Sequence, residues 1–368
     1  MRGSSVSCSL LVTLTLVGIG CVADDAPAET SPLTGIPFPT DGQGATNDDA
    51  MGGGETEEKL DVGGGSGGLP CAEGGDCGEC VPSTHTPCDA GANDMIAALG
   101  LNCPGDAVVE VSSSGNPAAM SVRTGFGSTN TWAPREGSAF AVLGSGFTTD
   151  LDLETPFGDL DIDPTHCNDD LGAQYDHGTT LPSPIRTNDV SGDCSTTPSL
   201  LGTGDCSNTI QGQFNQGGSA NDYTELRIVA DVPITNNSVS YDFAFFSTEY
   251  PWYYGSPFND MYIGWLESES WTGNISFDNA GNPISLNAGF LDFRDDSGSQ
   301  PQLAGTCMRQ HAGTTWLNST APVTPGETIT LVLAVFDLSD SILDSYVFLD
   351  NFGWGCDGDD TPHTTPVG

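Results

Sequence analysis

The sequence predicts an all-β protein, an antiparallel β-sandwich or jelly roll with one short N-terminal helix and long disulfide-pinned loops. Its 368 residues include 48 glycines and 24 prolines, which is a turn-rich composition. Charged residues make up 16% and are almost all acidic, so long helices supported by Glu/Lys pairs are not expected. Apolar and β-branched runs are short and are separated by Gly, Pro, Asn and Asp, which is the spacing of a sandwich.

The chain opens with a leader and an acidic tether. One basic residue, Arg2, precedes an apolar run at 10–19 that is too short for a permanent membrane span, which predicts a signal peptide at 1–20. The small residues before Cys21 resemble the bacterial lipobox, which implies a lipid on Cys21 that holds the protein to a membrane. The alternative is an ordinary signal peptide with another cleavage site. Residues 21–70 are Asp-, Glu- and Gly-rich, and we expect a disordered tether there.

The folded part is expected to begin with a Cys-rich junction at 71–87 and to continue as one β-sandwich domain at 88–357. A helix is expected at 94–101, with Asn93 or Asp94 as its cap and Gly100 near its end. The strands that the pattern predicts are 107–111, 139–143, 226–232, 239–246, 261–266, 274–277, 284–286, 328–336 and 346–352. The polar residues 358–368 are expected to form a disordered tail.

Two of these strands carry different patterns. Residues 239–246 alternate, which predicts one packed face and one face in water. Residues 329–336 are almost wholly apolar, which indicates a central strand buried on both faces. The segment 148–216 lacks long apolar runs, so we expect loops that disulfides pin to the domain.

The cysteines indicate an oxidising compartment. Of the 12, Cys8 lies in the leader and Cys21 is the lipid candidate, and the even number that remains predicts up to five disulfides whose pairing the sequence does not specify. The candidates are Cys71, Cys77, Cys80, Cys88, Cys103, Cys167, Cys194, Cys206, Cys307 and Cys356. A four-thiolate zinc site around the CxxC at 77–80 is the alternative for the first four.

Three blocks carry a family resemblance: 241–251 (YDFAFFSTEYP), 258–262 (FNDMY) and 336–350 (FDLSDSILDSYVFLD). With them the chain resembles the choice-of-anchor L domain family, of the myxobacterial lipoprotein type. The resemblance implies a β-rich domain on a bacterial surface, in the cell envelope or on an outer membrane lipoprotein. It brings no established catalytic residues. Many members are expected to carry a C-terminal sorting signal, and none follows Cys356, which places the anchor at Cys21.

Six carboxylates in these blocks are candidate calcium ligands: Glu249, Asp260, Asp337, Asp340, Asp344 and Asp350. Strand ends can bring such residues together, and acids gathered on so acidic a protein must protonate, separate or bind a cation. Calcium takes six to eight oxygens from carboxylates and carbonyls in irregular loops. The spacing is not that of an EF-hand. The alternative is separate carboxylates that cap loops and accept hydrogen bonds from backbone amides.

A second candidate site is aromatic. Trp252, Tyr253 and Tyr254 lie near proline and glycine, and rings exposed in such a loop could stack on sugar faces. The alternative is a satellite cluster packed over the edge of the sandwich.

These features predict a surface-displayed envelope lipoprotein that acts in adhesion or in recognition of an extracellular glycan or protein, with bound calcium as a stabiliser. The net charge of −42 repels phosphate backbones, so nucleic acid partners are excluded. No catalytic motif occurs in the folded region, since the one GxSxG match, at 64–68, lies in the tether. Two alternatives stay open: a purely structural envelope component, and an exported polysaccharide hydrolase with paired carboxylates such as Glu249 and Asp260.

Overall fold

A computed structural model describes residues 79–367 apart from 85, 92, 155–164 and 188–208. The signal peptide, Cys21, the tether and four candidate cysteines (Cys71, Cys77, Cys194 and Cys206) lie outside the described residues. No helix within the described ranges combines the length and the apolar character that crossing a bilayer requires.

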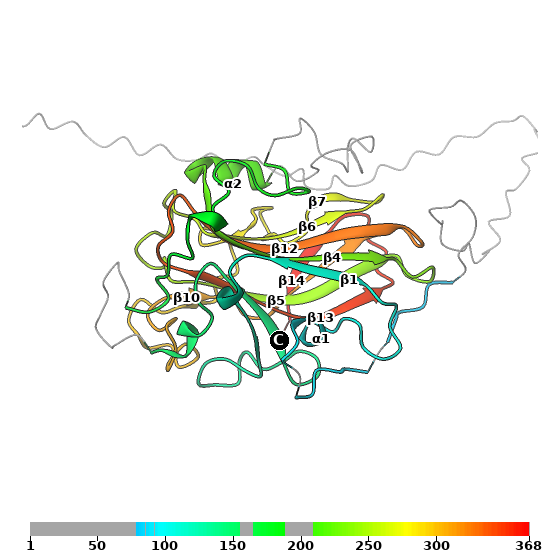
Figure 1. Cartoon of the computed structure of the whole chain (residues 1–368), viewed down its shortest axis with the longest axis horizontal. Helices are drawn as coiled ribbons and strands as arrows, with labels where there is room; N and C mark the ends of the chain where they lie inside the picture. Colours follow the sequence, from blue (N-terminus) through cyan, green and yellow to red (C-terminus); the bar gives the residue numbers. More distant parts are fainter. Residues whose placement is uncertain (1–78, 85, 92, 155–164, 188–208, 368) are drawn as a thin grey trace, which may run out of the picture. The chain divides into compact units, whose positions relative to one another are not determined.

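Two antiparallel sheets make up the described fold, which confirms the predicted all-β class (Figure 1). The first sheet has the order β1 (Glu110–Ser114), β4 (Ala220–Asp231), β12 (Thr328–Leu338), β6 (Met261–Glu267) and β7 (Thr272–Asn274), and β8 (Ile284–Ser285) pairs with β6. The second has the order β14 (His363–Pro366), β11 (Leu317–Pro322), β5 (Ser238–Ser247), β13 (Ser345–Gly355), β3 (Phe140–Gly144) and β2 (Met120–Arg123). There, β10 (Ala312–Gly313) pairs with β5 and with β9 (Phe293–Arg294).

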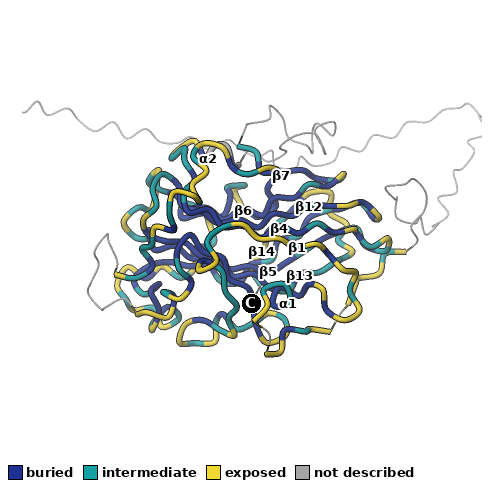
Figure 2. Tube along the Cα trace, viewed as in Figure 1, coloured by how far each residue is buried: buried dark blue, intermediate teal, exposed yellow. Residues whose placement is uncertain are grey.

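The main apolar core lies between the sheets. Alternate side chains of a strand point to opposite faces, so β4 and β12 contribute every second residue to this core, as do β5 and β13 from the other sheet. Members from the four strands include Leu226, Ile228, Leu331, Leu333, Phe243, Phe245, Val347 and Leu349. Figure 2 shows these central strands buried along most of their length.

The expectation that one face of 239–246 meets water is wrong. β5 lies between β11 and β13, and its outward residues Ala244 and Phe246 join a second apolar cluster with Trp132 and Phe348. Asp242 on that face is 2% exposed. The polar residues of this stretch predicted a face in water. Asp242 is buried instead because it forms an ion pair, with Arg135 Nε 3.1 Å from Asp242 Oδ2.

The prediction for 329–336 is confirmed. β12 lies between β4 and β6, and its outward residues Ala334 and Phe336 belong to a third apolar cluster. Helix α2 (Thr209–Gly217), which the sequence did not predict, covers this face with Ile210 and Phe214 (Figure 1). Both sheets are therefore covered on both faces.

The predicted helix is shorter than expected. Helix α1 spans Met95–Ala98, and the Asp94 side chain caps it by accepting from Ile96 N at 3.0 Å. The other helical turns among the described residues are short 3₁₀ segments at Pro117–Ala119, Asp150–Asp152 and Ala173–Tyr175. The prediction that residues 358–368 form a disordered tail is wrong in part, because His363–Pro366 forms the edge strand β14 against β11.

Three disulfides join described cysteines: Cys80–Cys356, Cys88–Cys103 and Cys167–Cys307. The zinc alternative is wrong, because two of its four thiolates are bonded to other cysteines. The first disulfide ties the junction at 71–87 to the end of β13. The third pins part of the long segment 148–216 to the loop before β10, as expected.

Candidate carboxylate centre and aromatic loop

Five acidic side chains meet where strands of both sheets end. Glu249 follows β5, Asp260 precedes β6, Asp337 lies near the end of β12, Asp344 precedes β13 and Asp222 lies near the start of β4. Antiparallel pairing explains the meeting, because the end of one strand lies beside the start of its neighbour. We call these five residues the carboxylate centre. Each is 1% exposed or less.

Alternation along the strands directs two of the acids inward, and a bulge in β4 places a third. Asp337 is two residues past Val335, a member of the core between the sheets, while its neighbours Phe336 and Leu338 face the outer cluster. Asp222 lies where the register of β4 against β12 shifts and has a φ of 50°, so this bulge sets its direction. Asp260 lies two residues before Tyr262, which is also a member of the core between the sheets. The rows that are apolar in the middle of the sandwich therefore become acidic at this end.

Hydrogen bonds satisfy some of these oxygens and leave others without a partner. Asp260 accepts from Leu338 N at 3.1 Å and from Ser345 Oγ at 2.7 Å. Asp344 accepts from Asp169 N at 2.9 Å and from the Tyr346 hydroxyl at 2.9 Å. Both carboxylate oxygens of Asp337, together with Glu249 Oε2 and Asp222 Oδ2, are buried without a hydrogen-bond partner.

The electrostatics follow from burial among like charges. Burial raises the pKa of Asp337 well above its usual range, and the nearby Asp260 and Asp344 raise it further. Burial likewise raises the pKa of Glu249, with added repulsion from Asp260 and Asp340. The pKa of Asp260 rises to about 7 from burial, although hydrogen bonds to Ser345 and Leu338 oppose the rise. Charged carboxylates in this place therefore need protons or a counter-charge.

Of the two other predicted calcium ligands, Asp340 borders the centre and Asp350 lies apart from it. Asp340 is in the β12–β13 loop at its rim, where it is only partly buried. Asp350 lies further along β13 on the outward face and accepts from Arg135 N at 2.6 Å and Glu136 N at 3.3 Å. It fits the alternative of a carboxylate that holds a loop by its backbone amides. Burial raises its pKa to about 7 against those hydrogen bonds.

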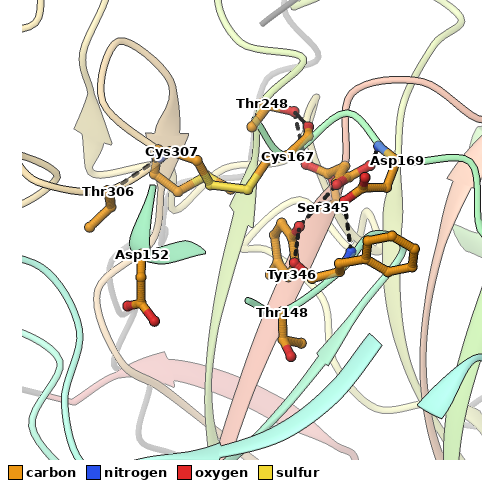
Figure 3. The surroundings of a disulfide bond; sticks show 12 residues. Thr148, Asp152, Cys167, Asp169, Thr248, Thr306, Cys307, Ser345 and Tyr346 are labelled. Carbon is orange, nitrogen blue, oxygen red and sulfur yellow. Dashed lines mark hydrogen bonds between the residues drawn. A yellow bond between two sulfur atoms is a disulfide. The ribbon is translucent and has the colours of Figure 1, made fainter. Parts of the chain in front are cut away.

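Two acids of this region were not predicted from the sequence. Asp222 accepts from Leu171 N at 2.9 Å, and Asp169 accepts from Phe147 N at 3.1 Å. Asp222 stands just before a predicted strand, as Asp260 and Asp344 do, and that shared position was the available signal. Figure 3 shows Asp169 and Tyr346 on the Cys167 side of the Cys167–Cys307 disulfide, which joins this loop to the loop before β10.

The predicted aromatic platform is only partly exposed. Trp252 and Tyr254 are 49% and 45% exposed, whereas Tyr253 is half-buried and packs on Phe258 with ring centroids 5.0 Å apart. The Arg294 guanidinium lies 4.7 Å from the centroid of the Tyr254 ring. Two rings of the three thus face solvent, and the third fixes the loop.

A separate surface group lies near the end of the described chain. One ligand atom from each of Asp357, Asp359 and His363 lies within 4.8 Å of the other two, which is a spacing that the described part of the carboxylate centre does not reach with any three side chains. The His363 ring nitrogens lie 3.5 Å from Asp357 Oδ2 and 3.6 Å from Asp359 Oδ2. These contacts are ion pairs when the ring is protonated.

The fold and these sites define the class: a disulfide-linked antiparallel β-sandwich with a buried carboxylate centre at one end. Residues 183–353 match the model of the family described as Choice-of-anchor L domain, and this matched segment agrees with the resemblance predicted from the sequence. It contains all five acids of the carboxylate centre and the aromatic loop. Choice-of-anchor domains are typical of cell-surface proteins.

Two further comparisons add little. No curated protein matches the chain. A solved structure of TmCBM61 in complex with β-1,4-galactotriose is similar over 67% of this chain and 88% of its own, at 10% identity and a TM-score of 0.23. At that score the likeness supports no conclusion about fold or ligand.

Proposed function

We propose that the protein is an envelope lipoprotein, held by lipid at Cys21, that recognises a neutral extracellular glycan through residues 250–254. The observation that carries the proposal is the pair of half-exposed rings, Trp252 and Tyr254, on a loop that the fold holds in place. A large ring in water on an otherwise well-packed domain has an apolar face free for a ligand.

The loop is fixed at several points, which lowers the entropy lost on binding. Tyr253 N donates to Glu249 O at 2.9 Å, and Gly255 N donates to Asn287 Oδ1 at 2.5 Å. Asn287 Nδ2 in turn donates to Ser256 O at 2.8 Å. The rings are therefore presented by a constrained segment.

Polar groups beside the rings suit a sugar. Arg294 Nη2 donates to the Tyr254 hydroxyl at 3.3 Å and keeps other N–H groups for ligand hydroxyls. Asp292 and Asp296 are exposed nearby in sequence and can accept from hydroxyls. The net charge of −42 repels acidic polysaccharides, so a neutral glycan is the ligand class that the chemistry favours.

A binding assay with neutral polysaccharides tests the proposal. We expect Trp252→Ala and Tyr254→Ala each to weaken binding about fivefold or more, because one ring–sugar stack is worth on the order of 1 kcal/mol or more. Ile234→Ala is the matched control, since Ile234 is 62% exposed on the turn between β4 and β5. Binding that survives both ring substitutions, or that selects proteins and no glycan, would contradict the proposal.

The hydrolase alternative is less well supported. The carboxylates that it would use, Glu249 and Asp260, are 1% and 0% exposed, so a glycosidic oxygen has no access to them in this structure. General acid catalysis requires hydrogen-bond contact with the substrate. Recognition without cleavage therefore fits these residues better.

A further inference from the structure

The geometry points to a divalent cation site at the carboxylate centre, with Ca²⁺ the ion that its chemistry fits. The cation would bind at most two of Glu249, Asp260 and Asp337 directly and the third through water, and it would join the end of the first sheet to the loop that follows β5. This inference is independent of the glycan proposal, because it concerns buried groups and needs no ligand at the surface.

The carboxylate centre lacks a basic side chain that would balance its charge. The arginine ion pairs of the described residues engage Asp152, Asp242, Glu267, Glu225 and Glu154. Within the described ranges, none of the five centre acids forms an ion pair with a basic side chain. Each of these acids is 1% exposed or less, so bulk solvent does not screen its charge.

Asp337 is 0% exposed, and neither of its carboxylate oxygens accepts a hydrogen bond from a donor. The neighbouring Ser145 hydroxyl donates to the Ser345 carbonyl at 3.3 Å, and the Ser345 hydroxyl donates to Asp260. A proton shared between Asp337 and Asp260 would neutralise only one of the two carboxylates. A cation instead satisfies both oxygens at once, because a carboxylate can bind Ca²⁺ through two oxygens.

Further oxygens near Asp337 could complete the coordination shell of a cation. Glu249 Oε2 is also buried without a partner, and it lies in the field of Asp260, which in turn acts on Asp337. No three of these carboxylates bring oxygens within 4.8 Å of one another. A bound ion would therefore complete its shell with backbone carbonyls and water, which irregular Ca²⁺ sites accept and octahedral Mg²⁺ sites accept less readily.

The position of the site has a consequence for the fold. Glu249 precedes the loop 250–259 and Asp260 follows it, so a cation between them fixes both ends of that loop. Asp337 adds β12, the central strand of the first sheet. Without the cation, repulsion among these acids would separate the same elements.

The test is a thermal melt of the full chain, freed of metal by chelator and buffer exchange, with and without added CaCl₂ at pH 7.5. At a Ca²⁺ concentration of 100 times Kd we expect the Tm to rise by about 5 °C, given linkage and the size of the domain. Calorimetric titration with Ca²⁺ should give a saturable signal, and the same concentration of MgCl₂ should shift the Tm less.

Asp337→Asn is the decisive variant, and Asp350→Asn is its matched control. Asp337→Asn should lose the Ca²⁺ shift yet melt no lower than the metal-free wild type, because it removes a buried repelling charge. Asp350 is also buried, at 1% exposed, but backbone amides hold it, so Asp350→Asn should keep the shift even if its Tm falls. Glu249→Gln should reduce the shift.

Two results would overturn the inference. A metal-free wild type whose Tm Ca²⁺ leaves unchanged would show that protons alone neutralise the centre. An Asp337→Asn variant with the full Ca²⁺ shift would place any bound ion elsewhere, for instance at Asp357, Asp359 and His363.

Discussion

Replacing Cys80 and Cys356 by alanine should destabilise the domain more than removing any short-range crosslink. The two residues are 276 apart in sequence, so their bond restricts the unfolded chain over nearly the whole domain. The bonds Cys88–Cys103 and Cys167–Cys307 already close 15 and 140 residues of that loop, which leaves about 120 residues for the Cys80–Cys356 bond to close.

The chain-entropy relation gives about 5 kcal/mol for a loop of that length and about 3 kcal/mol for a 15-residue loop. Cys356 is exposed and Cys80 half-buried, so alanine leaves little cavity there. Cys103 is 3% exposed, so replacing it by alanine adds a packing loss of up to about 1 kcal/mol to the Cys88→Ala/Cys103→Ala variant. The paired variants should therefore differ by about 1–2 kcal/mol.

Urea unfolding of the two double variants under oxidising conditions measures this difference, with the wild type as reference. Near-UV circular dichroism checks that both variants keep the packed aromatic clusters. If Cys88→Ala/Cys103→Ala is as unstable as Cys80→Ala/Cys356→Ala, or less stable, then loop length does not govern the stabilisation and the reasoning fails.

The remaining predictions concern His311 and Cys21. Burial lowers the pKa of His311 to about 4, so its contribution to stability is complete above pH 6.5 and is lost as the pH falls toward 4, on the order of 3 kcal/mol. His311→Asn keeps a donor for Tyr250 O, and the difference in unfolding free energy between variant and wild type should narrow over that range; a constant difference would contradict the assignment. Cys21→Ala should release the protein from the membrane fraction, and retention there would remove the lipid proposal.

The sequence predicted the strands whose burial is carried by apolar residues. β3, β6, β12 and β13 are runs of aliphatic and aromatic residues, and their predicted positions agree with the structure to within two or three residues. The strands β11 and β14 were missed because half of their residues are Asn, Ser and Thr, and only the pairing of β11 with β5 and of β14 with β11 reveals them. Helix α2 is rich in Gln and Gly, and its contact with the first sheet gives it a role that propensity does not indicate.

The candidate site was predicted in composition but not in arrangement. Strand ends marked Glu249, Asp260, Asp337 and Asp344, and the structure brings these four together. Asp350 was grouped with them because it is near in sequence, but it lies six residues along β13 from Asp344 and faces the outer cluster. Which strand ends meet depends on the order of strands in each sheet, and a single sequence does not encode that order in any local pattern.

The Cys80–Cys356 bond also sets how the domain bears tension. Any pull transmitted by the chain that precedes Cys80 reaches a covalent link to the end of β13, a strand in the middle of the second sheet. The force bypasses α1 and the edge strand β1, which would otherwise be the first elements to peel away. A protein pulled from its N-terminal side would thus resist the force through β13 and its neighbouring strands. Reduction of this one bond would let the force separate the strands one after another, beginning with β1.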